Sequence, residues 1–138
     1  MQYKLMAVDV DGTLLNSKKD LTPETITAIR EAVQGGLIFT ICTGRPIQGV
    51  EPLIEQLGLD LPFITYNGAM IVLGRSRQIL YAQTMRGEDA KSVFELGRRL
   101  QTTIVLWVNN KLYVKPLGDI AAAYSDLSRT EALPIEDL

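Results

Sequence analysis

The chain has 138 residues, of which 46% are hydrophobic and 22% charged, and its formal net charge is −2, which together fit one globular domain or one domain plus part of a second. This balance provides no basic surface for nucleic acid or an anionic membrane, and no apolar run reaches the ~18 residues of a membrane span. The absence of histidine excludes His-dependent triads and His-ligated zinc, and the single cysteine, Cys42, excludes an internal disulfide and fits a reducing cytoplasm.

The first part of the chain predicts alternating strands and helices. The expected elements are a strand over 4–10, a helix over 23–34, a strand over 37–42, a helix from about 49 to 57 and a strand over 62–66. Thr22 and Pro23 are typical of a helix start, whereas Pro52 is tolerated only in a first turn or at a kink. The first two strands are apolar enough to be buried, the second on both faces. Connections of this length favour parallel crossovers and an open α/β sheet.

The pattern changes after residue 68. Two hairpins are expected, 69–73 with 78–83 and 103–108 with 111–115, the second turning at Asn109-Asn110. A helix over 87–100 separates them, and a last helix is expected over 117–127. The inward residues of the 87–100 helix are predicted to be Ala90, Val93, Phe94 and Gly97. We place a domain boundary between residues 83 and 84, dividing the chain into 1–83 and 84–138.

Two acids follow the first strand at a spacing that brings them together. Asp9 and Asp11 lie where the strand ends before Gly12, and side chains at i and i+2 of a strand point to the same side. Neighbouring carboxylates repel unless a cation is present, and Mg²⁺ prefers oxygen ligands. A calcium loop is excluded, because its fifth and sixth positions are Thr13 and Leu14 instead of a ligand and a glycine. A solvated Asp-Gly turn stays open as the alternative.

Further polar loops follow the second and third strands. Thr43-Gly44-Arg45 comes directly after the second strand, and Asn67 follows the third. Ligands of open α/β sheets bind at the carboxyl ends of the strands. We therefore expect the three loops to converge on one site.

Three short motifs in this order are similar to those of a known family. Residues 9–14 read Asp-Val-Asp-Gly-Thr-Leu, residues 43–45 read Thr-Gly-Arg, and residues 66–69 read Tyr-Asn-Gly-Ala before a hairpin. The chain thus resembles the haloacid dehalogenase-like hydrolases, and within them the Cof-type subfamily. The resemblance implies an α/β fold: the first part of a Rossmann-like parallel-sheet core over 1–83, then the first part of an α/β cap over 84–138.

The resemblance also implies roles for individual residues. Asp9 corresponds to a nucleophile that forms an aspartyl-phosphate and binds Mg²⁺, and Asp11 to a general acid and base whose backbone carbonyl also meets Mg²⁺. The phosphate-binding groups would be the Thr43 hydroxyl and the main chain near Val10, Gly12 and Gly44. Arg45 and Asn67 are candidates for substrate or loop contacts, and Asn67 serves equally well as a turn residue.

The implied function is that of a Mg²⁺-dependent phosphatase acting on a small phosphorylated metabolite such as a sugar phosphate. The family also carries a downstream lysine and a later Gly-Asp-x-x-x-Asp motif, and the lysines at 91, 111 and 115 are out of order for that role. We therefore expect an N-terminal fragment that is weakly active or inactive alone and that is exposed to self-association. The alternatives are a phosphomutase of the same fold, a non-catalytic phosphate-binding module and a phosphorylated receiver.

Overall fold

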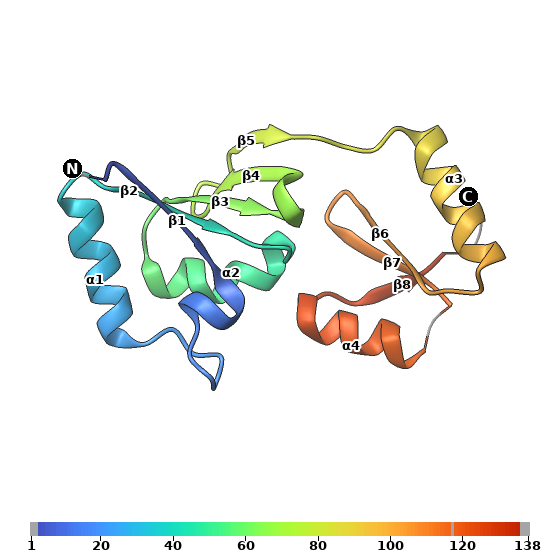
Figure 1. Ribbon diagram of the computed structural model, residues 1–138, viewed down its shortest axis with the longest axis horizontal. Helices are drawn as coiled ribbons and strands as arrows, with labels where there is room; N and C mark the ends of the chain where they lie inside the picture. The colour runs from blue at the N-terminus through green and yellow to red at the C-terminus, as the bar shows by residue number, and fades with distance from the viewer. Residues whose placement is uncertain (1–2, 117, 136–138) are drawn as a thin grey trace. The chain divides into compact units, whose positions relative to one another are not determined.

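The computed structural model describes residues 3–116 and 118–135, and the chain divides into two compact units (Figure 1). The first unit ends at Gln83 and the second begins at Thr84. The chain changes there from an exposed strand to an extended connection that leads into a helix. Each unit has its own sheet and its own core, so each is described separately.

The first unit is an α/β structure with a five-stranded mixed sheet, as expected. Its elements are β1 (Leu5–Asp9), α1 (Pro23–Gln34), β2 (Ile38–Cys42), α2 (Ile47–Leu57), β3 (Pro62–Thr65), β4 (Met70–Leu73) and β5 (Ile79–Ala82). The strands lie in the order β1-β2-β3-β4-β5; the first three are parallel, and β4 and β5 are antiparallel to their neighbours. The predicted alternation of strands and crossover helices and the first hairpin are therefore confirmed.

The helix ends follow the capping chemistry of the sequence. The Thr22 hydroxyl accepts the backbone N–H of Thr25 at 3.3 Å, which fixes the start of α1 at Pro23. Helix α2 begins at Ile47, two residues before the predicted start, and Pro52 lies inside it. The helix tolerates this proline because its apolar face is buried in the core, and that burial outweighs one missing hydrogen bond. Gly58, at φ 67°, ends α2.

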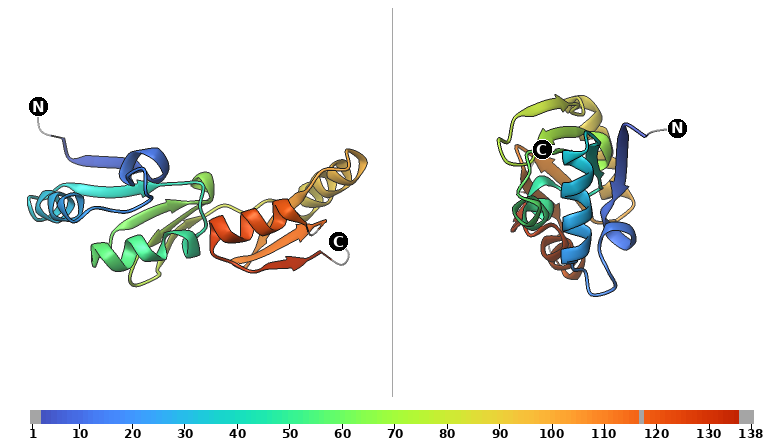
Figure 2. Two further views of the ribbon diagram at one scale, coloured as in Figure 1. Left: turned by 90° about the horizontal axis from the view of Figure 1, so that it is seen from below. Right: turned by 90° about the vertical axis from the view of Figure 1, so that its left-hand side faces the viewer.

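Both helices of the first unit pack on one face of the sheet (Figure 2, right). Phe39, Ile41 and Phe63 from the strands share a single buried cluster with side chains from α1 and α2, such as Ile29 and Val50. Right-handed crossovers place their helices on the same face when successive strands are added in the same direction, as β1, β2 and β3 are. The direction in which successive strands are added to the sheet therefore decides which of its faces the helices cover.

The predicted burial is wrong for the first strand and is confirmed only in the middle of the second. β1 is the outermost strand of the sheet, and Leu5 and Met6 keep 56% and 51% of their surface exposed. On β2, the consecutive residues 39–41 are buried although their side chains alternate between the two faces, whereas Ile38 at the start of the strand is 54% exposed. An apolar run shows that a strand is suited to burial, but the cover has to come from other segments.

The second unit has a three-stranded sheet with a helix on each face. Its elements are α3 (Gly87–Arg99), β6 (Ile104–Val108), β7 (Lys111–Lys115), α4 (Asp119–Ser128) and β8 (Ala132–Pro134). The predicted hairpin is confirmed, since β6 and β7 are antiparallel and Asn109 and Asn110 adopt φ values of 50° and 61°. The parallel strand β8 was not predicted, because three residues ending in proline give no strand pattern. The predicted helix start at residue 117 lies outside the described residues.

Helix α3 contacts the sheet through Phe94 and Gly97, as predicted, but Val93 is 45% exposed and its predicted inward position is wrong. A side chain one position before Phe94 is turned by about 100° around a helix, which carries it off the buried stripe. A Cβ on Gly97 would lie 2.5 Å from Ile104 Cγ1, so only glycine lets α3 approach β6 this closely. Within residues 3–116 and 118–135, none of the helices has the length and apolarity needed to cross a membrane.

Candidate active site

The first part of the site is the turn that follows β1. Asp9 is the last residue of β1, and Val10–Leu14 form a turn closed by the Leu15 N–H, which donates to the Val10 carbonyl at 3.1 Å. Gly12 adopts φ 79°, a left-handed conformation that favours glycine. Val10 is fully buried and anchors the turn, whereas the two acids on either side of it are exposed. The turn thus presents Asp9 and Asp11 at the carboxyl end of the strand.

The second part is the loop after β2, and it is tied to the sheet. The Thr43 N–H donates to the Ile64 carbonyl at 2.9 Å, and the Thr43 hydroxyl accepts the Arg45 N–H at 3.1 Å. Thr43 is only 7% exposed. A hydroxyl that accepts one hydrogen bond still carries a proton that it can donate. Thr43 is therefore a rigid, nearly buried donor at the edge of the site.

Arg45 joins the loop after β2 to the turn after β1. Its Nε and Nη2 donate to the two carboxylate oxygens of Asp11, at 2.9 Å and 2.6 Å. Its Nη1 donates to the Gly49 carbonyl in the first turn of α2, at 3.1 Å. The Arg45 side chain is 15% exposed and the Asp11 side chain 51%. This bidentate pair fixes the orientation of Asp11.

The third part is the turn after β3, which packs against the loop after β2. The N–H groups of Tyr66 and Asn67 donate to the carbonyls of Arg45 and Thr43, at 3.1 and 3.2 Å. Both donors have positive φ, 51° and 55°, a strained conformation for an aromatic residue. A Cβ on Gly44 would lie 2.8 Å from Asn67 Oδ1, so Gly44 makes room for the Asn67 side chain. The three strand-end loops therefore form one connected assembly, as the sequence predicted.

The two acids differ in their surroundings. Asp11 has both oxygens bonded to Arg45, whereas among the described residues no hydrogen bond or ion pair holds the Asp9 carboxylate. The sequence predicts Arg45 only as a candidate for a substrate or loop contact, and its pairing with Asp11 was not predicted. The available signal was the position of an arginine two residues after Thr43, on the loop next to the acid turn.

The candidate metal ligands of the site are of the type that a hard cation prefers, but they are too few to complete its coordination. The candidate ligands are oxygens only, from the Asp9 carboxylate and the Asp11 main chain, which is the chemistry that Mg²⁺ prefers. Across the part of the chain that the structure describes, no three His, Cys, Asp or Glu side chains gather as a metal cluster. The acids present here would therefore supply part of a magnesium site.

Known proteins similar to this chain share both its sequence pattern and its fold. The sequence profile of the haloacid dehalogenase-like hydrolases matches residues 6–132. The chain is 34% identical over 122 residues to the putative phosphatase YxeH of Bacillus subtilis, a match covering 86% of this chain and 45% of that protein. It is 31% identical over 121 residues to the pyridoxal phosphate phosphatase YbhA of Escherichia coli, covering 87% of this chain and 44% of that protein.

A solved structure agrees with this assignment at the level of the fold. A haloacid dehalogenase-like hydrolase from Bacteroides thetaiotaomicron superposes with a TM-score of 0.82 at 24% identity, covering 99% of this chain and 53% of the other. The chain thus spans about half the length of the relatives that it matches. The resemblance indicated by the motifs is confirmed, and the chain belongs to the haloacid dehalogenase-like hydrolases.

Proposed function

We propose that this chain carries the site of a Mg²⁺-dependent phosphatase that works through an aspartyl-phosphate. In this proposal Asp9 attacks the phosphorus of a phosphomonoester, a bond forms from its carboxylate oxygen, and the bond to the leaving oxygen breaks. Asp11 gives the leaving oxygen a proton. Water then attacks the aspartyl-phosphate, with Asp11 accepting its proton, and releases inorganic phosphate.

The unequal surroundings of Asp9 and Asp11 carry this assignment. A nucleophilic carboxylate has to be free of hydrogen-bond and ion-pair partners to reach the phosphorus, and the Asp9 carboxylate has none among the described residues. A general acid or base has to be held in place, and Arg45 holds Asp11 by two bonds. The structure thus supports distinct roles for two acids that look alike in the sequence.

The remaining loop groups suit a phosphoryl group. Thr43 offers a nearly buried hydroxyl, and the turn around Val10 and Gly12, together with Gly44, offers main-chain N–H groups. Mg²⁺ bound by Asp9 and the main chain of Asp11 would offset the repulsion between a carboxylate and a phosphate anion. Phosphoryl transfer depends mainly on this kind of alignment and charge stabilisation.

Arg45 orients the proposed acid without blocking it. Each Asp11 oxygen accepts one bond from Arg45 and keeps a further lone-pair site, so a leaving oxygen can reach the acid while the pair stays in place. The bond from Arg45 to the Gly49 carbonyl anchors the guanidinium to α2. We therefore assign Arg45 to positioning Asp11 and Asn67 to supporting the loop of Thr43 and Gly44.

We propose a small phosphorylated metabolite as the substrate, such as a sugar phosphate or a phosphorylated cofactor. The E. coli relative is named for one such compound, pyridoxal phosphate. The second unit is proposed to act as a cap whose closure selects the leaving group. We place the enzyme in the cytoplasm, in keeping with its single free cysteine, Cys42.

The test uses a chimera in which this chain replaces the matching part of the B. subtilis relative. We expect it to release phosphate from a panel of phosphomonoesters only when Mg²⁺ is present. Asp9→Asn should reduce the rate at least about a thousandfold, because it removes the nucleophile, and Asp11→Asn about a hundredfold to ten-thousandfold. Ser17→Ala, on the exposed loop outside the site, is the control and should keep full activity.

Three outcomes would contradict the proposal. Full activity of Asp9→Asn would remove Asp9 as nucleophile, and turnover without any metal would remove the cation. An isomerised sugar phosphate in place of inorganic phosphate would identify a phosphomutase. The 138-residue chain alone is expected to be weakly active or inactive, since it supplies only part of the metal site.

A further inference from the structure

Gly49 occupies a position where the backbone does not require a glycine. It is a buried residue in the first turn of α2, and its φ lies outside the left-handed region that favours glycine. Glycine weakens a helix relative to alanine, because it loses more conformational freedom on folding. The neighbouring residues Ile47 and Val50 are 8% and 0% exposed and fix this turn in the core. The reason for a glycine here therefore lies in what a side chain would contact.

A side chain at residue 49 would press on the stem of Arg45. A Cβ placed on Gly49 lies 3.2 Å from Arg45 Cβ and 3.6 Å from Arg45 Cδ. The first distance is shorter than the about 3.5–4.0 Å of an ordinary contact between carbon atoms. The same Cβ lies 3.4 Å from Cδ of Pro46, which is buried and cannot turn aside. An added methyl group would therefore shift the Arg45 stem.

The carbonyl of the same glycine holds the far end of that stem. Arg45 Nη1 donates to the Gly49 carbonyl at 3.1 Å, while Nε and Nη2 donate to the two carboxylate oxygens of Asp11. The guanidinium is rigid and planar, so its three nitrogens move together when the stem moves. The Gly49 N–H donates to the Pro46 carbonyl at 3.0 Å, which holds the acceptor in place. Gly49 thus leaves room for the stem and supplies one of the bonds that orient the guanidinium.

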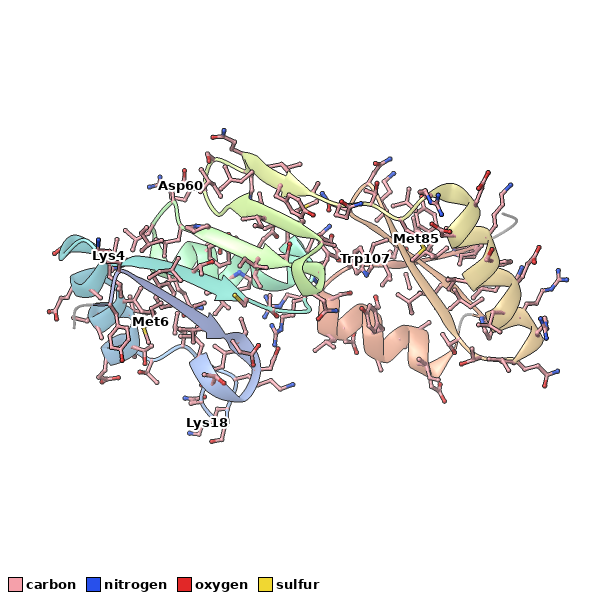
Figure 3. All side chains as sticks on the ribbon, turned by 45° about the horizontal axis from the view of Figure 1, so that its top comes forward. Lys4, Met6, Lys18, Asp60, Met85 and Trp107 are labelled. Atoms are coloured by element: carbon pink, nitrogen blue, oxygen red, sulfur yellow. The ribbon has the colours of Figure 1, made fainter. Side chains whose placement is uncertain are left out.

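The orientation of Asp11 depends on this one arginine. Among the described residues, Arg45 is the cation that forms an ion pair with Asp11. Lys18 lies on the exposed loop that follows the turn of the two acids and points outward (Figure 3). A displacement of the Arg45 guanidinium is therefore passed directly to the Asp11 carboxylate.

We propose that Gly49 is a positioning residue for the acid Asp11 and acts through Arg45. The absence of a side chain at residue 49 sets where the guanidinium lies, and the guanidinium sets the direction of the carboxylate. A shift of a few tenths of an ångström at the stem lengthens at least one of the two bonds, because a planar fork meets both oxygens in one geometry. The catalytic consequence rests on the proposed function, in which Asp11 exchanges protons with the leaving oxygen and with water.

The first experiment measures kinetics in the chimera described above. Gly49→Ala should lower kcat about tenfold and leave KM within about twofold, because a misdirected acid slows the reaction without weakening substrate binding. Tm should stay the same or rise, since alanine favours a helix. Gly35→Ala is the matched control and should keep kcat. This glycine ends α1 at φ −74°, and a Cβ on it makes ordinary contacts of 3.4 and 3.5 Å with carbonyl oxygens of its own helix.

A double variant tests the route through Arg45. Arg45→Ala should itself lower kcat, and Gly49→Ala added to it should have no further effect, because no stem remains to be displaced. An equal loss of kcat in both backgrounds would mean that Gly49 acts by another route and would overturn the proposal. A fall in Tm that accompanies the loss of kcat would also overturn it, because the glycine would then have a purely structural role.

A third measurement needs no substrate. In the 138-residue chain the Arg45 Nε–H donates to Asp11, so its proton should exchange slowly with water in ¹H–¹⁵N NMR spectra. Gly49→Ala should raise this exchange rate at least about tenfold, and Gly35→Ala should leave it unchanged. Unchanged exchange or unchanged kcat in Gly49→Ala would overturn the proposal. A parent chimera without phosphatase activity would contradict only the proposed function, and the exchange rate of the Arg45 Nε–H would then decide whether Gly49 positions Arg45.

Discussion

The ion pair between Arg45 and Asp11 should stabilise the first unit more than an ordinary surface pair does. Two charged N–H groups meet two carboxylate oxygens, and the arginine is already fixed by its bond to the Gly49 carbonyl. Exposed ion pairs contribute about 0.2–1 kcal/mol, and hydrogen bonds to charged groups about 1.5–3 kcal/mol. With Arg45 15% and Asp11 51% exposed, we expect a coupling energy of about 1–2 kcal/mol, between these two ranges.

A double-mutant cycle measures this coupling. Asp11→Ala removes the acceptor, Arg45→Met removes the charge while keeping most of the aliphatic stem, and the double variant closes the cycle. The readout is the free energy of opening from native-state hydrogen exchange at buried amides of β2, such as those of Phe39 and Ile41. Fluorescence of Trp107, which lies on β6 in the second unit, should not change and serves as an internal check.

The chain contains a matched control pair in the same unit. The side chains of Arg77 and Glu51 are joined by one charged hydrogen bond of 3.0 Å, and both side chains are more than 40% exposed. Their coupling is expected to be about 0.5 kcal/mol or less, because solvent screens the pair and both side chains lose entropy in forming it. A coupling for Arg45 and Asp11 that is no larger than the control would refute the argument that the arginine holds the acid in place.

Three further predictions concern stability. Gly97→Ala should destabilise the second unit by about 1–2 kcal/mol in urea unfolding followed by Trp107 fluorescence, because the clash with Ile104 costs more than the gain in helix propensity; an unchanged midpoint would contradict the packing. Thr22→Ala should lower the free energy of unfolding of the first unit by about 1 kcal/mol, measured by native-state hydrogen exchange at the buried amides of β2. An unchanged free energy would mean that the hydrogen bond from the Thr25 N–H to the Thr22 hydroxyl is not formed. The backbone N–H of Ser76 holds the pKa of Asp60 below its ordinary value of 3.8, so Asp60 stabilises the fold above that pH and loses this effect as the pH falls through its lowered pKa. Asp60→Asn should therefore lower Tm at pH 7, and the difference from the parent chain should shrink as the pH falls below 3.8, whereas a difference independent of pH would contradict the sign.

Local signals in the sequence were sufficient for most individual elements. The N-cap Thr22, the glycines that end both helices of the first unit and the Asn109-Asn110 turn each act on neighbouring residues, so their effects can be predicted without the fold. The errors have tertiary causes: α2 keeps Pro52 because its other face is buried, and β8 exists only because β7 provides an edge to pair with.

In the candidate site, too, some features could be predicted from local sequence and others depend on tertiary contacts. Placing Asp9, Thr43 and Asn67 at strand ends required only strand order and the rule that parallel strands end at one edge. The bond between Arg45 and Asp11 spans 34 residues, and the contact of Gly44 with Asn67 joins two separate loops. Contacts of this kind depend on the distance between loops, which local sequence does not encode.

The sequence by itself determined the α/β pattern, the family to which the chain belongs and the positions of the two candidate acids. These follow from residue spacing and from motifs that act over a few positions. Only the tertiary structure decided that, among the described residues, Asp9 has no partner while Arg45 holds Asp11, and that β1 is an exposed edge strand. Side-chain pairing and burial depend on which segments are adjacent in space, and here the strand order and the direction of the crossovers decided this.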